Sequence, residues 1–153
     1  MICEMDMNDE QAAEAVWYLQ HAAFREEARR VGLPHVPPPT DTVESLRRSE
    51  ERYIGYLSDG EWTGAVSYIL NGKLLSIRRL MVHPDHFRQG IGSALIAHLL
   101  ASVPHEQAEV YASERNEPAM RLYRKYGFVP VEQVPAAYGL SLLRLVRNNP
   151  ALP

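Results

Sequence analysis

Hydrophobic residues recur at helical spacing in four segments of the chain and at alternate positions in seven others. Apolar residues at every third or fourth position give a helix one apolar face, as Ile91, Leu95 and Leu99 do. Side chains that accept hydrogen bonds from backbone N–H groups stand before the first two such segments and can begin a helix there. The expected helices run from Asn8 or Asp9 to about Val31, from Thr40 or Asp41 to about Arg52, over Gly90–Val103 and over Pro118–Tyr126.

The extended segments are rich in β-branched and aromatic residues, as strands are. Asp59-Gly60 and Asn71-Gly72 separate three consecutive segments of this kind, and such dipeptides are the strongest short signals for antiparallel hairpins. The prolines of residues 34–39 exclude a helix there and predict an exposed loop. The expected strands are residues 1–7, Tyr53–Leu57, Trp62–Leu70, Leu74–Val82, Ala108–Ala112, Phe128–Gln133 and Tyr138–Val146.

This order of elements predicts a mixed α/β (α+β) fold with a largely antiparallel central sheet flanked by helices. The chain has 153 residues, of which 46% are hydrophobic and 23% charged, which fits a single globular domain over residues 1–153. Its acidic N-terminus lacks the features of a signal peptide, and no apolar run is long enough to span a membrane. We therefore expect one soluble cytoplasmic domain.

Charge and cysteine usage exclude several classes of function. A formal net charge of −3 gives no electrostatic footprint for nucleic acid. Cys3 is the only cysteine, which excludes an internal disulfide and a CxxC pair for zinc or redox chemistry, so we expect it to be a small buried hydrophobic residue. His83, Asp85 and His86 lack a spaced partner elsewhere, so we expect solvated loop residues there and no metal.

The segment most informative about function is residues 74–93, in which a strand is followed by a proline-containing turn and a helix start. The first N–H groups of a helix lack intrahelical partners and carry about half a positive charge. Gly90 and Gly92 would let an anion approach these groups, and Arg88 adds a cation, so the segment predicts a diphosphate cradle. Alternatively, the glycines only allow a tight turn into a packed helix.

A dinucleotide-binding oxidoreductase is a competing hypothesis for the same glycines, with Glu114 as the ribose-binding acid. Two features count against it. The chain takes seven residues between Val82 and Gly90, whereas the dinucleotide fingerprint turns almost directly out of its strand. Leu95 also stands where that fingerprint has its third glycine.

Two segments together resemble the GNAT superfamily of N-acetyltransferases. Residues 74–93 resemble its acyl-CoA segment, in which a strand and Val-x-Pro precede a glycine-rich helix start. Residues 116–128 match its second segment at each fixed position, namely Asn116, Ala119, Tyr123, Gly127 and Phe128. The resemblance implies the GNAT-like acyl-CoA N-acyltransferase fold and transfer of an acyl group, acetyl in the simplest case, from acetyl-CoA to a primary amine in a ternary complex.

The resemblance also implies roles for individual residues. The backbone of the strand end would pair with the pantetheine arm as an added strand, and amides at the helix start would hold the diphosphate. Asn116 would bond the pantetheine or position the cofactor, and Tyr123 would protonate the departing thiolate. Final strands in this superfamily often form homodimers. The implied cofactor-binding residues are Leu80, Met81, Val82, Arg88, Gln89, Gly90, Ile91, Gly92, Ser93 and Asn116.

The chain departs from the family pattern in two places. Phe87 stands where the family has Gln or Arg, which removes a polar side chain from the cradle. The strand before Val82 carries no carboxylate to act as general base, which leaves Glu109, Glu114 or water for that role. These departures support an alternative hypothesis of a non-catalytic CoA- or partner-binding module.

Several residues have a structural interpretation beside the functional one. Tyr123 could be a core aromatic residue, and Asn116 could only cap a helix. Strand alternation would put Ser76, Arg78 and Leu80 on one face and Ile77, Arg79 and Met81 on the other. One of the two arginines could bind a carboxylate of the acceptor, or pair with Glu44 or Glu26.

The helices and loop of residues 20–50 would cover the acceptor in the family fold. His35 could line the acceptor site or lie on the surface. We expect the charged run Arg25–Arg30 to be a solvated helix face with pairs between residues four apart.

Overall fold

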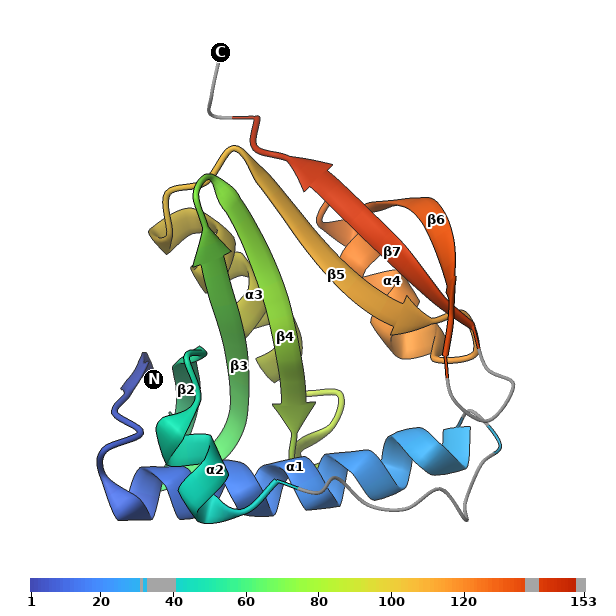
Figure 1. Ribbon diagram of the computed structural model, residues 1–153. Coiled ribbons are helices and arrows are strands. Elements are labelled where there is room, and N and C mark those ends of the chain that lie inside the picture. The colour runs from blue at the N-terminus through green and yellow to red at the C-terminus, as the bar shows by residue number, and fades with distance from the viewer. Residues whose placement is uncertain (31, 33–40, 137–140, 151–153) are drawn as a thin grey trace.

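The computed structural model describes residues 1–30, 32, 41–136 and 141–150 and shows one mixed sheet with helices on both faces (Figure 1). Among these residues the strands lie in the order β1-β2-β3-β4-β5-β7-β6, and every neighbouring pair is antiparallel except β4 and β5. The strands are β1 (Ile2–Met5), β2 (Arg52–Ser58), β3 (Glu61–Asn71), β4 (Leu74–Val82), β5 (Gln107–Ser113), β6 (Val129–Pro135) and β7 (Ser141–Asn148).

Helices cover the two faces of the sheet and enclose two hydrophobic cores. A short 3-10 turn, η1 (Pro84–His86), connects β4 to the third helix. The helices are α1 (Glu10–Arg30), α2 (Val43–Arg48), α3 (Ile91–Ser102) and α4 (Glu117–Lys125). The α3 core includes Leu75, Ile77, Leu95, Tyr123 and Phe128. The α1 core, on the other face, includes Val16, Leu19, Leu46, Tyr53 and Met81.

No helix in the described part of the chain is long and apolar enough to cross a membrane.

The strand and helix order expected from the sequence is confirmed, and the two hairpins are present. Asp59 and Gly60 both have positive φ, 51° and 81°, which is the geometry of the two-residue turn that matches strand twist. The loop at residues 34–39, with His35, and the start of the last strand at Tyr138 lie outside the described residues.

The second helix is shorter than expected and begins later. Its cap is Thr42, not Thr40 or Asp41, because Thr42 and Ser45 exchange backbone-to-side-chain hydrogen bonds in a capping box. The helix ends at Arg48 instead of near Arg52, because Ser49 takes an extended conformation. Glu51 follows and turns its carboxylate toward the sheet.

Strands β4 and β5 pair only at Leu74–Ser76 and then diverge. Figure 1 shows them side by side at one end and separated at the level of α1. Arg78 is an extra residue in β4, because Ser67 of β3 pairs with Arg79 and the next residue, Tyr68, pairs with Ile77. Such a bulge twists and bends the strand that carries it.

The bulge overturns the expected strand alternation. Ile77 packs in the α3 core, whereas Met81 packs in the α1 core, so these residues do not share a face. Leu80 lies against the α3 core together with Ile77. One extra residue reverses the face of all positions beyond it, which alternation counted from the sequence alone does not include.

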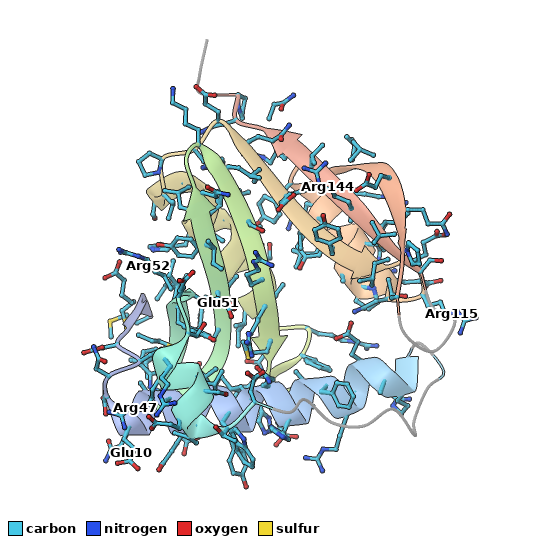
Figure 2. The ribbon with its side chains drawn as sticks, in the orientation of Figure 1. Glu10, Arg47, Glu51, Arg52, Arg115 and Arg144 are labelled. Carbon is cyan, nitrogen blue, oxygen red and sulfur yellow. The ribbon has the colours of Figure 1, made fainter. Side chains whose placement is uncertain are left out.

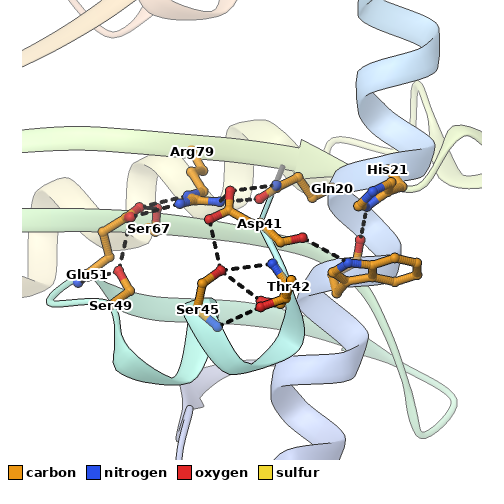
Figure 3. A network of polar contacts seen from close by, with 10 residues as sticks. Gln20, His21, Asp41, Thr42, Ser45, Ser49, Glu51, Ser67 and Arg79 are labelled. Atoms are coloured by element: carbon orange, nitrogen blue, oxygen red, sulfur yellow. Dashed lines mark hydrogen bonds and ion pairs between the residues drawn. The ribbon is translucent and has the colours of Figure 1, made fainter. Parts of the chain in front are cut away.

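Arg79 is the centre of a polar network that ties β4 to α1 and to the segments around α2 (Figure 3). Its Nε and Nη2 donate to the two oxygens of Glu51 at 3.0 and 3.1 Å, and Nη1 donates to Asp41 Oδ2 at 2.9 Å and to Gln20. Ser67 of β3 donates to Glu51 at 2.6 Å. Of the two interpretations of the adjacent arginines, ion pairing therefore holds for Arg79, with partners other than Glu44 and Glu26.

Glu51 gives this network a pH-dependent stability. Burial alone would raise the pKa of its carboxyl, but hydrogen bonds from Arg79 and Ser67 outweigh burial and lower it below the ordinary 4.5. A lowered pKa in the folded state means that the stabilisation is complete above pH 4.5 and is lost as the pH falls through the folded pKa.

We expect Glu51→Gln to reduce the free energy of unfolding at pH 7 by about 2 kcal/mol, because it removes one charge from a half-buried ion pair. Urea denaturation at pH 7 and at pH 3.5 measures the difference, which should shrink at the lower pH, because below pH 4.5 the unfolded wild-type chain gains a proton at this carboxyl and the stabilisation declines. Glu50→Gln changes the exposed neighbour and is the control. An equal loss at both pH values would contradict this role of Glu51.

Candidate functional site

A cavity of about 740 Å³ lies where the end of β4, the start of α3 and the start of α4 meet under α1. Its wall combines an apolar part with several cations and backbone amides. Such a volume falls within the usual range of small-molecule sites. We call it the cradle cavity, and it is lined among others by Leu80, Val82, Phe87, Arg88, Gly90, Ile91, Gly92, Arg115, Asn116 and Arg121.

The start of α3 supplies the backbone donors of the cradle cavity. Gly90 is the N-cap with φ 77°, and no side chain caps the helix, so the first amides are left for another acceptor. A Cβ built on Gly90 meets nothing within 4 Å, which shows open space at this point of the wall. Arg88 also has positive φ, 65°, and left-handed residues of this kind turn successive N–H groups toward one point.

The predicted cradle residues do not all contribute their side chains to this cavity. Arg88, Gly90, Ile91 and Gly92 line it, whereas Gln89 and Ser93 do not. The Ser93 hydroxyl lies 2.6 Å from the Tyr126 hydroxyl and accepts from Lys125 at 3.2 Å. The side chain of Ser93 therefore joins α3 to the end of α4.

The edge of β4 that faces β5 is unpaired beyond Ser76 within the described strands. Its other edge pairs with β3 on both sides of the bulge, with Leu80 opposite Val66, Met81 opposite Ala65 and Val82 opposite Gly64. Backbone groups of residues 77–82 on the open edge can thus accept an extended ligand as an added strand. This is the arrangement that the resemblance implied for Leu80, Met81 and Val82.

A second cavity of about 340 Å³ occupies the gap between β4 and β5, and we call it the reaction cavity. It adjoins the cradle cavity, because Ala23, Glu27, Leu80, Asn116 and Ala119 line both. Its other lining residues include Gln20, Phe24, Arg78, Arg79, Met81, Tyr111 and Tyr123.

Tyr123 reaches the reaction cavity from α4 and is 4% exposed. Its ring packs edge-on against Phe128, with 5.7 Å between the ring centroids. Burial, and secondarily the charge of Glu27, raise its pKa above the ordinary value of 10, so the hydroxyl keeps its proton at neutral pH. Tyr123 therefore packs in the α3 core, as one interpretation expected, and it also borders the reaction cavity, where the catalytic interpretation needs it.

Asn116 is a helix cap, as one of its two interpretations expected, and it also borders the cavities. Its Oδ1 accepts from Ala119 N at 3.4 Å and so caps α4. Its Nδ2 donates to Glu27 Oε1 at 3.4 Å, and its side chain borders both cavities.

The carboxylates proposed as general base from the sequence lie away from the reaction cavity. Glu109 accepts from Ser76 at 2.8 Å and from Arg144 of β7 at 2.8 Å, so each of its oxygens has a partner (Figure 2 labels Arg144). Glu114 is exposed and lines neither cavity.

Glu27 is the carboxylate that the sequence interpretation missed. It is exposed, as expected of a solvated helix face, and because α1 crosses the gap between β4 and β5 it also borders both cavities. The neighbouring Glu26 pairs instead with Arg29, three residues on. In the sequence, the only indication of this position was that Glu27 lies near the end of a helix that covers the acceptor in the family fold.

The turn before α3 has the solvated character expected of it. The His83 Nδ1 accepts from the backbone of Asp85 at 3.1 Å, and His86 contacts Gln89. Within the described residues, no three His, Cys, Asp or Glu side chains gather closely enough to hold a metal ion.

The groups around the two cavities suit the parts of acetyl-CoA. Uncapped amides, Arg88 and open space at Gly90 suit a diphosphate, and the unpaired edge of β4 suits the amide-bearing pantetheine arm. Phe87 lines the cradle cavity, so the polar side chain that the family has there is replaced by an apolar wall.

Comparison with known proteins agrees with this fit. A model of the acetyltransferase (GNAT) family matches residues 7–128. The chain is 38% identical over 131 residues to UPF0157 protein YqkA of Bacillus subtilis (strain 168), a match that covers 85% of the chain and 38% of that relative. It is 39% identical over 70 residues to peptidyl-lysine N-acetyltransferase YiaC of Escherichia coli (strain K12), covering 46% of the chain and 44% of that relative. Both matches span less than half of the relative's length.

Among solved structures, the fold is similar to that of yncA from Salmonella typhimurium, which was determined with acetyl-CoA. The TM-score is 0.76 at 16% identity, and the match covers 100% of this chain and 95% of the other. At this identity the similarity establishes the mixed sheet and its helices as a shared fold.

Gly90→Ala tests the cradle, and Gly60→Ala is its matched control. Both glycines have φ near 80° and open space at the Cβ position, so each substitution should cost about 1–2 kcal/mol of stability through left-handed strain. Only Gly90→Ala should weaken the binding of CoA, by roughly tenfold, because strain relief there turns the first amides of α3 away from the cavity. Calorimetric titration with CoA measures this, and equal affinities of the two variants would contradict the cradle.

Proposed function

Because the chain belongs to the acetyltransferase (GNAT) family, we propose that it transfers an acetyl group from acetyl-CoA to a primary amine. The observation that carries the proposal is the adjacency of two cavities along the open edge of β4, one lined by Arg88 and the glycines that begin α3 and the other by the buried Tyr123. A diphosphate held at the cradle and a pantetheine arm laid along β4 would bring a thioester to the reaction cavity.

Acetyl-CoA supplies an activated acetyl group, and its transfer breaks a carbon–sulfur bond and forms a carbon–nitrogen bond. The sulfur that departs gains a proton, and Tyr123, which borders the reaction cavity, is the proposed donor. A thiol has an ordinary pKa near 8.5, so a neutral phenol beside the sulfur limits the build-up of thiolate charge.

The amine nitrogen loses a proton as the new bond forms, and Glu27 is the carboxylate at the reaction cavity that can accept it. A primary amine with a pKa near 10.4 is almost fully protonated at pH 7, so this removal is required for attack. Glu27 also attracts the ammonium form before the reaction, which brings the acceptor to the thioester.

Cytoplasmic location and a homodimer through the final strands stay predictions.

Tyr123→Phe tests the proton donor. Turnover should fall by about 10²- to 10³-fold because the departing sulfur loses its acid, while the KM for acetyl-CoA should change by less than about twofold. Release of free thiol with a panel of amines measures both values. Tyr68→Phe, which alters a buried tyrosine of β3 outside both cavities, is the control.

Full activity of Tyr123→Phe would make Tyr123 a core residue only. If the wild-type protein binds acetyl-CoA and no amine releases thiol, the chain is a non-catalytic CoA-binding module instead.

Glu27→Gln tests the proton acceptor. We expect kcat/KM at pH 7 to fall about 10- to 100-fold, since the amide cannot take a proton from the amine. This deficit should narrow as the pH rises toward 10, because more of the amine is then neutral without help. The pH profile of Glu14→Gln, an exposed position earlier on α1, is the reference, and a deficit independent of pH would refute proton transfer to Glu27.

A further inference from the structure

Arg78 is the extra residue of the β4 bulge, and its side chain lines the reaction cavity. The strand has already separated from β5 at this position, because their last pair is Ser76 with Glu109. The bulge thus places a long cationic side chain at the gap in which the acceptor must meet the thioester.

The two adjacent arginines differ in whether the guanidinium already has partners within the protein. The guanidinium of Arg79 is occupied by Glu51, Asp41 and Gln20. Across the described residues, Arg78 makes no hydrogen bond or ion pair and is exposed. An arginine in the middle of a sheet without a protein partner is available for a ligand.

A ligand bound by Arg78 would lie in a different cavity from the diphosphate. Arg78 lines the reaction cavity and does not line the cradle cavity, where Arg88, Arg115 and Arg121 lie. The positive charge of Arg78 is therefore separate from the charge that faces the phosphates.

Glu27 brings one negative charge to the same cavity, so the pair Arg78 and Glu27 matches a ligand with one positive and one negative group. The planar guanidinium binds a carboxylate through two parallel hydrogen bonds. A phosphate dianion would carry more negative charge than Arg78 alone balances and would be repelled by Glu27. The volume of about 340 Å³ lies at the small end of ligand sites and suits the end of an acceptor only a few bonds long.

We propose that the acceptor is a primary amine that carries a carboxylate a few bonds from its nitrogen, and that Arg78 binds this carboxylate. The inference rests on the proposed acetyl transfer and names its acceptor class. The ammonium group lies toward Glu27 and the carboxylate toward Arg78. The two contacts together fix the orientation of the acceptor in the reaction cavity. Two sources offer this chemistry, a free amino acid and a peptide whose first residue is acidic.

The test compares acceptors that differ only in the carboxylate. One arm uses free amino acids against their α-amides, and the other uses peptides that begin with Glu against peptides that begin with Gln. The measured quantity is kcat/KM for thiol release by wild-type protein, Arg78→Gln and Arg52→Gln. Arg52 is the control because it is exposed at the start of β2 and lines neither cavity, and Figure 2 shows it on the opposite side of the molecule from Arg115.

We expect the wild-type protein to prefer the carboxylate acceptor of at least one arm by about 10- to 100-fold, the value of a charge-assisted contact. Arg78→Gln should lose this preference and keep its affinity for acetyl-CoA, and Arg52→Gln should behave as wild type. The arm that shows the preference identifies the source of the carboxylate. Equal use of both members of each pair, or a preference that survives in Arg78→Gln, overturns the proposal.

A binding measurement separates this inference from the proposed function. CoA-saturated protein is titrated with N-acetylated amino acids and N-acetylated Glu peptides and with their amide counterparts, which needs no turnover. Selective binding of the carboxylates that Arg78→Gln abolishes supports the role of Arg78 even if no amine releases thiol, in which case acetyl transfer alone fails. If the protein releases thiol but binds the carboxylates and the amides equally, acetyl transfer is supported and the role of Arg78 is refuted.

Discussion

The separation of β4 from β5 is the constraint on which the candidate site depends. The two strands pair over Leu74–Ser76, where Glu109 joins Ser76 to Arg144 and fixes the closed end of the gap. Beyond that point the bulge at Arg78 bends β4, and its backbone faces an open space instead of a neighbouring strand. A continuous sheet would have neither a free strand edge nor a gap for two reactants. Because α1 crosses this gap, the opening becomes a cavity with three walls and not an exposed sheet edge.

The charges around the gap divide into those that hold the fold and those that face the cavity. Arg79, Glu51, Asp41 and Gln20 satisfy one another and bind α1 and the residues around α2 to the sheet. Breaking such a half-buried pair leaves a charge without a partner, so these groups are held in place by the cost of separating them. Arg78 and Glu27 belong to the second group, because both border the reaction cavity. Arg78 has no hydrogen-bond or ion-pair partner among the described residues. The same residue type at adjacent positions therefore holds the fold together at Arg79 and, in our proposal, binds the acceptor at Arg78.

Local signals were enough to predict most of the fold and the cradle. The hairpin at Asp59-Gly60, the glycine-rich start of α3 and the spacing from Asn116 to Phe128 each depend on residues near one another in sequence. The features that sequence did not predict depend on contacts between distant elements. The bulge that puts Ile77 and Met81 on opposite faces of the sheet arises from the pairing of β3 with β4. Glu27 reaches the cavity only because α1 lies over two diverging strands. Likewise, the partners of Arg79 come from the segments on either side of α2, which no spacing rule connects to β4.

Two protons must move in opposite directions within one small cavity, and the burial of the groups involved suits that requirement. Tyr123 is nearly inaccessible, and burial together with the charge of Glu27 raises its pKa, so it begins the reaction protonated. Glu27 is exposed, borders the cavity and accepts a hydrogen bond from Asn116 Nδ2. The negative charge that holds the amine thus also keeps the acid from losing its proton early. In the proposed transfer, a proton taken up by Glu27 would remove the negative charge that raises the pKa of Tyr123, so the phenol would become a stronger acid at the stage when the sulfur needs a proton.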